Sequence, residues 1–281
     1  MTASDAIADS EWPEAEGGLL LRVKEGVAYA TFNRPEARNP MATPIRLALS
    51  KFLERVKDDP GIRVLVLQGA GTSFVAGGDV KSFAQGLKMT ASERSIDMES
   101  RAAGAGVLSA QLADLPQPVV VAARGPAAGY GASMIYAADF VILSDTARIS
   151  LSHVGLNLVP DGGATWFLPR IVGPKRAASI AMLGDPMLPD EALAIGIATQ
   201  VVPDGELETV AEALARRLAA APRAALTEIK QLLQASYGTG LKDQANAEAA
   251  AIGRCVRTED YVEGLTALLE KRRPRFGASG A

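Results

Sequence analysis

The chain has 281 residues, of which 48% are hydrophobic and 22% charged, and its formal net charge is -3. This composition is that of an ordinary globular protein of one or two domains, and the acidic balance gives no support to nucleic-acid binding. The single cysteine, Cys255, excludes an intramolecular disulfide, and a single histidine, His153, argues against a His-rich zinc site. The apolar runs are too short to cross a bilayer and residues 1–17 lack a signal-peptide pattern, so we expect a cytoplasmic protein.

The first elements in chain order are two strands with a helix between them. The apolar runs at residues 27–32 and 63–69 predict strands, and residues 43–59 repeat apolar side chains at helical spacing. Thr43 is the expected N-cap of this helix, with Pro44 at its first position. The residues expected on its buried face are Ile45, Leu49, Phe52, Leu53 and Val56. Strands that alternate with helices predict an α/β fold.

A long helix is expected over residues 91–115, followed by a strand, a segment of small residues and another strand. The residues available for one face of the long helix are Ile96, Ala103, Val107 and Leu112. From about residue 204 the pattern is helical throughout, with one apolar stripe formed by Leu207, Val210, Leu214 and Leu218. We therefore divide the chain into a loosely held N-terminal segment (1–17), an α/β core (18–205) and a C-terminal helical region (206–281).

Two glycine-containing stretches each follow a predicted strand. The first is TSFVAGGDV, residues 72–80, and the second is GPAAGYGAS, residues 125–133. Small residues there leave backbone N–H groups unshielded, and two such groups directed at one carbonyl oxygen stabilise an oxyanion. Close packing of a helix on a strand is the alternative reason for small residues. Neither stretch contains a phosphate-binding P-loop pattern, and no nucleophile elbow occurs in the chain.

Five ordered motifs give the chain a family resemblance. They are FNRPEARN (32–39), SFVAGGDVK (73–81), GPAAGYGAS (125–133), VPDGGATWFLPRIVG (159–173) and DEALAIGIATQVVP (190–203). In this order they resemble the crotonase family, the enoyl-CoA hydratase and isomerase superfamily, over roughly residues 18–276. The resemblance implies a core of repeated ββα units, a C-terminal helical region, and homotrimers that often pair into hexamers. It implies an acyl-CoA thioester as substrate, with coenzyme A as part of that substrate and no separate cofactor or metal.

The resemblance also assigns site residues. The thioester oxygen would be held by the backbone amides of Gly78 and Tyr130, which answers why glycines stand there. The residues expected along the acyl-CoA channel are Ala76, Asp79, Val80 and Lys81, with Ala37 near the adenosine and pantetheine part. Asp79 is also expected to bond nearby backbone.

The general acid and base decide the reaction. Hydratases of this family use two glutamates, and the matching positions here hold Ser133 and His153, so water addition is put in doubt. Asp161, in VPDGG, matches an acid that moves a proton in isomerase-like branches. The leading hypothesis is therefore an enoyl-CoA isomerase with Asp161 as acid and base. His153 is a further candidate acid or base; the alternative is a residue of the core or the pocket wall whose hydrogen bonds are satisfied. For Asp161 the alternative is that its side chain caps the following helix.

Other functions stay open from the sequence. They are a hydratase with atypical catalytic groups, a dehalogenase-like member, and an acyl-CoA-binding scaffold without activity. Trp166 and Phe167 are expected to pack in the core. Acyl specificity is expected to depend on residues 82–118.

Overall fold

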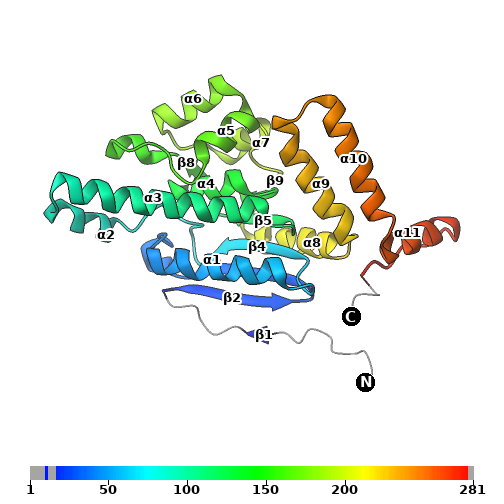
Figure 1. Cartoon of the computed structure of the whole chain (residues 1–281). Coiled ribbons are helices and arrows are strands. Elements are labelled where there is room, and N and C mark those ends of the chain that lie inside the picture. Colours follow the sequence, from blue (N-terminus) through cyan, green and yellow to red (C-terminus); the bar gives the residue numbers. More distant parts are fainter. Residues whose placement is uncertain (1–9, 12–16, 278–281) are drawn as a thin grey trace.

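The computed structural model describes residues 10–11 and 17–277 of the chain (Figure 1). Most of the expected N-terminal segment 1–17 therefore lies outside the described residues, although Ser10–Glu11 forms a short strand, β1, paired with residues 22–23. Within the described ranges, none of the helices combines the length and the apolarity that crossing a bilayer requires.

A main sheet and a small one organise the fold. Along the main sheet the strands follow the order β1, β2 (Leu19–Lys24), β3 (Val27–Phe32), β4 (Val64–Gly69), β5 (Val119–Ala123), β7 (Phe140–Ser144) and β9 (Gln200–Val202). The first three strands are antiparallel and the later neighbours are parallel. A separate pair, β6 (Pro126–Ala128) and β8 (Arg148–Ser150), is also parallel. The α/β class expected from the sequence is confirmed.

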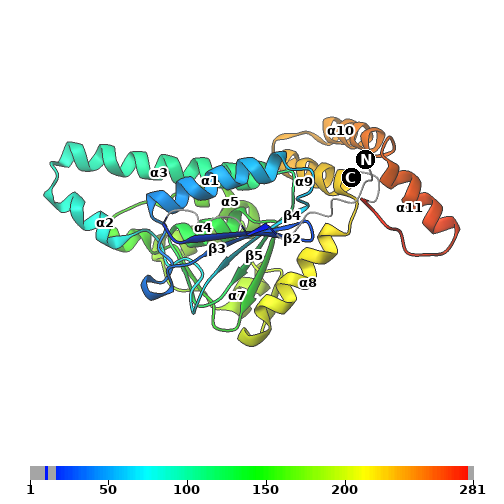
Figure 2. The same cartoon turned by 90° about the horizontal axis from the view of Figure 1, so that it is seen from below.

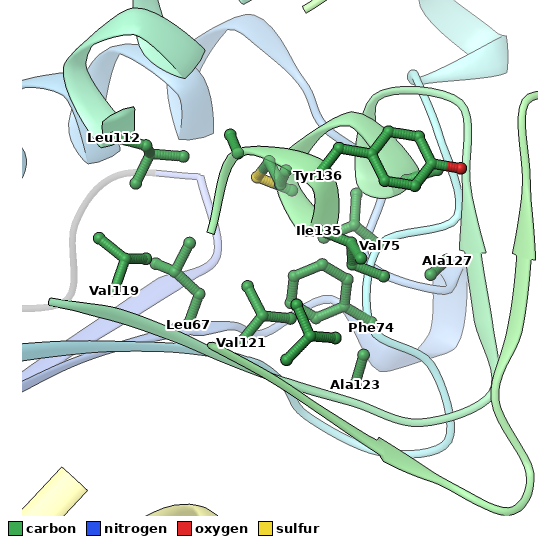
Figure 3. Packing of buried hydrophobic residues seen from close by; sticks show 14 of the residues in the cluster. Leu67, Phe74, Val75, Leu112, Val119, Val121, Ala123, Ala127, Ile135 and Tyr136 are labelled. Atoms are coloured by element: carbon green, nitrogen blue, oxygen red, sulfur yellow. The ribbon is translucent and has the colours of Figure 1, made fainter. Parts of the chain in front are cut away.

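Successive side chains of a strand point to opposite faces of the sheet, and in the parallel strands both faces are buried. In β5, Val119 and Val121 belong to one apolar cluster, whereas Val120 belongs to the other. The larger cluster lies beneath α4 (Tyr130–Ala137), where Leu67, Phe74 and Val121 meet the helix residue Ile135 (Figure 3). Figure 2 shows the sheet between the layer of α1 and α3 on one side and α8 on the other.

Helix α1 (Thr43–Asp58) buries all five residues expected from its periodicity. Its N-cap is Ala42, not Thr43, and no side chain caps it. The chain just before this helix is already held by a tertiary contact, since the Met41 amide donates to the Gly77 carbonyl at 2.8 Å. The first helical turn is therefore set by that contact, and Thr43 becomes its first residue.

Helix α3 (Ala91–Asp114) spans the expected segment, but its buried face differs from the expected one. Of the four predicted residues only Leu112 is buried, and Ile96 and Val107 are 66% and 58% exposed. The buried residues are Ala105, Leu108, Ser109 and Leu112. They lie in the C-terminal half because the N-terminal half extends past the sheet, alongside α2 (Val80–Gln85) and the 3-10 turn η2 (Gly86–Lys88) (Figure 1).

The helices that follow are short up to β9 and longer after it. The short ones are α5 (Ala164–Val172), α6 (Pro174–Leu183) and α7 (Pro189–Ala194), and the 3-10 turn η3 (Ser152–Leu156) precedes them. Another 3-10 turn, η1 (Pro35–Ala37), lies earlier in the chain, between β3 and α1. Trp166 in α5 is 46% exposed, so the expectation that it packs in the core is wrong, whereas Phe167 does pack against the core. Trp166 instead stacks with Arg170, whose guanidinium carbon lies 4.0 Å from the ring centroid.

The C-terminal region consists of helices, with short 3-10 turns η4 (Asp204–Glu206) and η5 (Ser236–Gly238). The helices are α8 (Leu207–Ala219), α9 (Arg223–Ala235), α10 (Leu241–Cys255) and α11 (Glu259–Leu269). Helix α8 covers one face of the sheet with Leu207, Ala211 and Leu218. Helices α9, α10 and α11 lie beside the core (Figure 1). The buried Lys230 links α9 to the core, because its Nζ atom pairs with Asp139 at 2.7 Å.

Candidate active site

The two glycine stretches lie side by side. Ala76 and Ala128 form a parallel bridge, and the Ala128 amide donates to the Val75 carbonyl at 2.9 Å. Gly77 (φ +95°) and Gly129 (φ +55°) adopt left-handed backbone conformations that favour glycine. The two segments that the sequence placed after separate strands therefore meet at one place.

A cavity of about 190 Å³ opens at this meeting point. Its walls come from the glycine stretches, from helices α1, α2 and α3, and from the loop that contains η3. The lining residues are Met41, Ala42, Thr43, Arg46, Ala76, Gly77, Gly78, Val80, Phe83, Met98, Arg101, Ala105, Gly129, Tyr130, Ser152, His153, Leu156, Leu158 and Asp161. The cavity is therefore mainly apolar, with a few charged and polar groups directed into it.

Gly78 and Tyr130 both line this cavity. Within the described part of the chain, neither of their backbone amides donates a hydrogen bond to a protein acceptor. Tyr130 is the first residue of α4, where an amide has no acceptor inside the helix and the helix dipole favours negative charge. Gly78 and Tyr130 thus each keep a backbone N–H group that no protein acceptor among the described residues uses.

The side chain of Tyr130 reaches away from these amides to helix α3. Its phenol lies 3.3 Å from the hydroxyl of Ser109, and the residue is only 5% exposed. Burial raises the pKa of the Tyr130 phenol, and the nearby Asp161 charge raises it further. The phenol therefore stays protonated near neutral pH.

Asp161 and His153 form the polar pair of the cavity. The Oδ1 atom of Asp161 lies 3.3 Å from Nε2 of His153. The Asp161 side chain is 29% exposed, and that of His153 is 10% exposed. The expected alternative, in which Asp161 caps the following helix, is wrong: the N-cap of α5 is Gly163 and no side chain caps that helix.

Ser133 supports the Asp161 backbone from beneath. It is fully buried in α4, and its hydroxyl donates to the main-chain carbonyl of Asp161 at 2.9 Å. Gly162 (φ +60°) packs so closely on α4 that a side chain there would collide with the Tyr130 ring. Helix α4 thus carries one free amide and also positions the loop with the carboxylate.

The remaining predicted residues are divided between the cavity and its surroundings. Ala76 and Val80 line the cavity, whereas Ala37 and Lys81 are exposed and lie outside its lining. Asp79 caps α2 by accepting from the Lys81 amide at 3.1 Å, and it pairs with Arg34 at 3.4 Å. Its expected bonding to nearby backbone is confirmed.

Sequence reasoning missed several lining residues as individuals. Phe83, Met98, Arg101 and Ala105 fall within the expected specificity segment 82–118, but Arg46 of α1 lies outside it. No motif marks Arg46, because it reaches the cavity only through the packing of α1 on α3. Among the described residues, no three His, Cys, Asp or Glu side chains gather as metal ligands do.

Comparison with known proteins adds to this geometry. A family model described as enoyl-CoA hydratase/isomerase matches residues 22–279. The chain is 36% identical to 1,2-epoxyphenylacetyl-CoA isomerase of Escherichia coli and 33% identical to crotonyl-CoA hydratase of Syntrophomonas wolfei, each over 92% of this chain and 97% of the relative. The crystal structure of an enoyl-CoA hydratase from Polaromonas sp. JS666 superposes with a TM-score of 0.86 at 27% identity, over 92% of this chain and 100% of that one.

Proposed function

The chain belongs to the enoyl-CoA hydratase/isomerase family, and from this premise we propose that it is an enoyl-CoA isomerase that shifts a double bond along the acyl chain of a CoA thioester. The observation that supports this most is the carboxylate of Asp161 in the same cavity as the two free amides. A single carboxylate is sufficient for moving a proton between two carbons.

In the proposed reaction the thioester oxygen accepts hydrogen bonds from the amides of Gly78 and Tyr130. With a 3-enoyl thioester, Asp161 removes a proton from C2, and the electron pair spreads over the thioester as a dienolate. The two amides stabilise the negative charge on oxygen. Asp161 then returns the proton to C4, so that the double bond ends between C2 and C3 and the carboxylate is regenerated.

His153 has a positioning role in this proposal. Its imidazole holds one oxygen of the Asp161 carboxylate, and Ser133 holds the main chain of the same residue. The two glutamates that hydratases use for water addition have no equivalent here, because the matching positions are Ser133 and His153. The hydroxyl of Ser133 already donates to a carbonyl. The neutral Tyr130 phenol is not available as a base.

The experiment that tests the proposal compares two substrates. The protein is expected to convert a 3-enoyl-CoA to the 2-enoyl-CoA and to add water to crotonyl-CoA slowly or not at all. Rapid hydration of crotonyl-CoA without isomerisation would contradict it. Binding of CoA thioesters without turnover of either substrate would instead indicate an acyl-CoA-binding scaffold.

We also propose that the chain forms a homotrimer or a pair of trimers. Large apolar side chains are exposed on the helices beside the core. They include Ile229, Leu233, Leu241, Ile252, Val262, Leu265, Leu268 and Leu269. Contacts between copies of the chain would remove these side chains from water.

A further inference from the structure

Two arginines of the cavity, Arg46 and Arg101, have no role in the proposed reaction. Arg46 lies in the first turns of α1 and lines the cavity. Its guanidinium packs against Gly104 of α3, where any side chain would collide with it. Within the described residues, no hydrogen bond or ion pair is made by this guanidinium.

Arg101, the other arginine of the cavity, is already neutralised. Its Nε atom pairs with Asp97 at 2.7 Å, and Nη1 donates to the hydroxyl of Ser82 at 2.9 Å. Its guanidinium carbon also lies 5.8 Å from the centroid of the Phe83 ring. The two arginines therefore differ, because the charge of Arg101 is compensated by the protein and that of Arg46 is not.

The acid that lines the cavity is Asp161, which His153 holds. Arg46 and Asp161 both act on the buried phenol of Tyr130: burial raises the pKa of that phenol most, the Asp161 charge raises it further, and the Arg46 charge lowers it. No direct contact between Arg46 and Asp161 is present.

A half-buried cation without a partner is costly unless a ligand supplies an anion. The planar guanidinium matches a carboxylate by two parallel hydrogen bonds. Gly104 contributes to this arrangement, since its lack of a side chain leaves room for the guanidinium between α1 and α3.

We infer that the acyl group bound in this cavity carries a carboxylate that pairs with Arg46, so that the substrate is the mono-CoA thioester of a short dicarboxylic acid. This inference rests on the proposed function for the placement of the thioester, and it names the substrate class of that site. The apolar residues Phe83, Met98 and Ala105 would contact the methylene groups between the two ends.

The test measures binding with saturated thioesters, which have no double bond to shift. Dissociation constants are determined by calorimetry for glutaryl-CoA against pentanoyl-CoA and for adipyl-CoA against hexanoyl-CoA. The wild-type protein is expected to bind the acidic member of at least one pair about tenfold or more tightly, as a charge-assisted bidentate contact provides. Equal or weaker binding of both acidic members would overturn the inference without any variant.

The variants assign the preference to one residue. Arg46→Met is expected to remove the preference for the acidic thioester, and Arg46→Lys is expected to keep part of it. Arg176→Met, which removes an exposed charge on α6, controls for the net charge. An unchanged preference in Arg46→Met, or equal weakening of acidic and neutral thioesters, would contradict the assignment. If Arg46→Met does not fold, the dissociation constants of Arg46→Gln are compared with those of the wild-type protein in its place.

Failure of the inference and failure of the proposed function give different results. Asp161→Asn is expected to lose isomerisation and to keep the preference for the acidic thioester. A protein that isomerises 3-enoyl-CoA but shows no acidic preference would overturn only the inference. A protein that prefers the acidic thioesters but isomerises nothing would overturn only the proposed reaction.

Discussion

The Nε2 atom of His153 lies 3.3 Å from Oδ1 of Asp161, while the other imidazole nitrogen, Nδ1, is buried without a hydrogen-bond partner among the described residues. Nε2 is therefore the imidazole nitrogen that can hydrogen-bond to the carboxylate, and it donates to Oδ1 when it carries the hydrogen. Oδ2 of Asp161 makes no hydrogen bond within the described part of the chain, and it is the oxygen we expect to carry the proton.

Replacing Asp161 by Asn is expected to reduce isomerisation of a 3-enoyl-CoA by roughly 10²- to 10⁴-fold, the contribution of a general acid-base group. The amide keeps the size of the side chain but cannot exchange the proton. Folding, followed by circular dichroism, and binding of a saturated acyl-CoA are expected to survive. Wild-type turnover in Asp161→Asn would show that another group moves the proton.

Replacing His153 by Ala removes the donor that orients the carboxylate. We expect kcat to fall about ten- to a hundredfold, as the loss of a hydrogen bond to a charged group implies, with KM little changed. His153→Gln keeps an N–H donor and is expected to recover part of kcat. If both variants raised KM and left kcat unchanged, His153 would contact the substrate rather than position Asp161.

The backbone donor at residue 130 can be removed with little disturbance, because proline is tolerated at the first position of a helix. Tyr130→Pro deletes this N–H group, whereas Tyr130→Ala keeps it and removes the same side chain. We expect kcat of the proline variant to be about 10²- to 10³-fold below that of the alanine variant, as for a lost oxyanion donor. Equal kcat values would place the thioester oxygen elsewhere. Gly78 is less suited to this kind of substitution, because any side chain there would collide with the Phe83 ring.

The Lys230–Asp139 pair offers a test of stability. The Lys230 ammonium is buried, and it also donates to the carbonyls of Leu112 and Gln117. Lys230→Met leaves Asp139 without its counter-ion, and we expect the free energy of unfolding in urea to fall by about 1–3 kcal/mol, because the Asp139 side chain is 24% exposed and water can solvate it. The exposed Lys51→Met should change it by less than about 0.5 kcal/mol. Adding Asp139→Asn should restore part of the loss, and a fully additive double variant would contradict the pairing.

Light scattering tests the proposed assembly. A trimer has three times the chain mass of 29.3 kDa. Leu268 and Leu269 of α11 are 73% and 75% exposed, and replacing both by Lys is expected to shift the mass toward that of a smaller species. Leu87→Lys, at a site 81% exposed next to α2, is the control and should keep the wild-type mass. A wild-type monomer at micromolar concentration would contradict the proposal.

Local sequence patterns were sufficient for much of the fold. The apolar runs at residues 27–32 and 63–69 form strands β3 and β4, and the five buried positions of α1 follow from helical spacing alone. The patterns failed where burial depends on what lies opposite. Ile96 and Val107 are apolar and sit in the expected helix, yet they are exposed because only the C-terminal half of α3 lies over the core.

The family resemblance, the two small-residue stretches and the carboxylate at Asp161 depend on residue type and order, so they can be recognised without a structure. Which groups meet depends on how the helices and loops pack. The packing of the η3 loop against the loop before α5 brings His153 to Asp161, and the packing of α1 on α3 brings Arg46 into the cavity beside Gly104. Contacts of this kind join segments whose local sequence patterns carry no information about one another. The composition of the site is therefore set by the arrangement of the helices around the sheet.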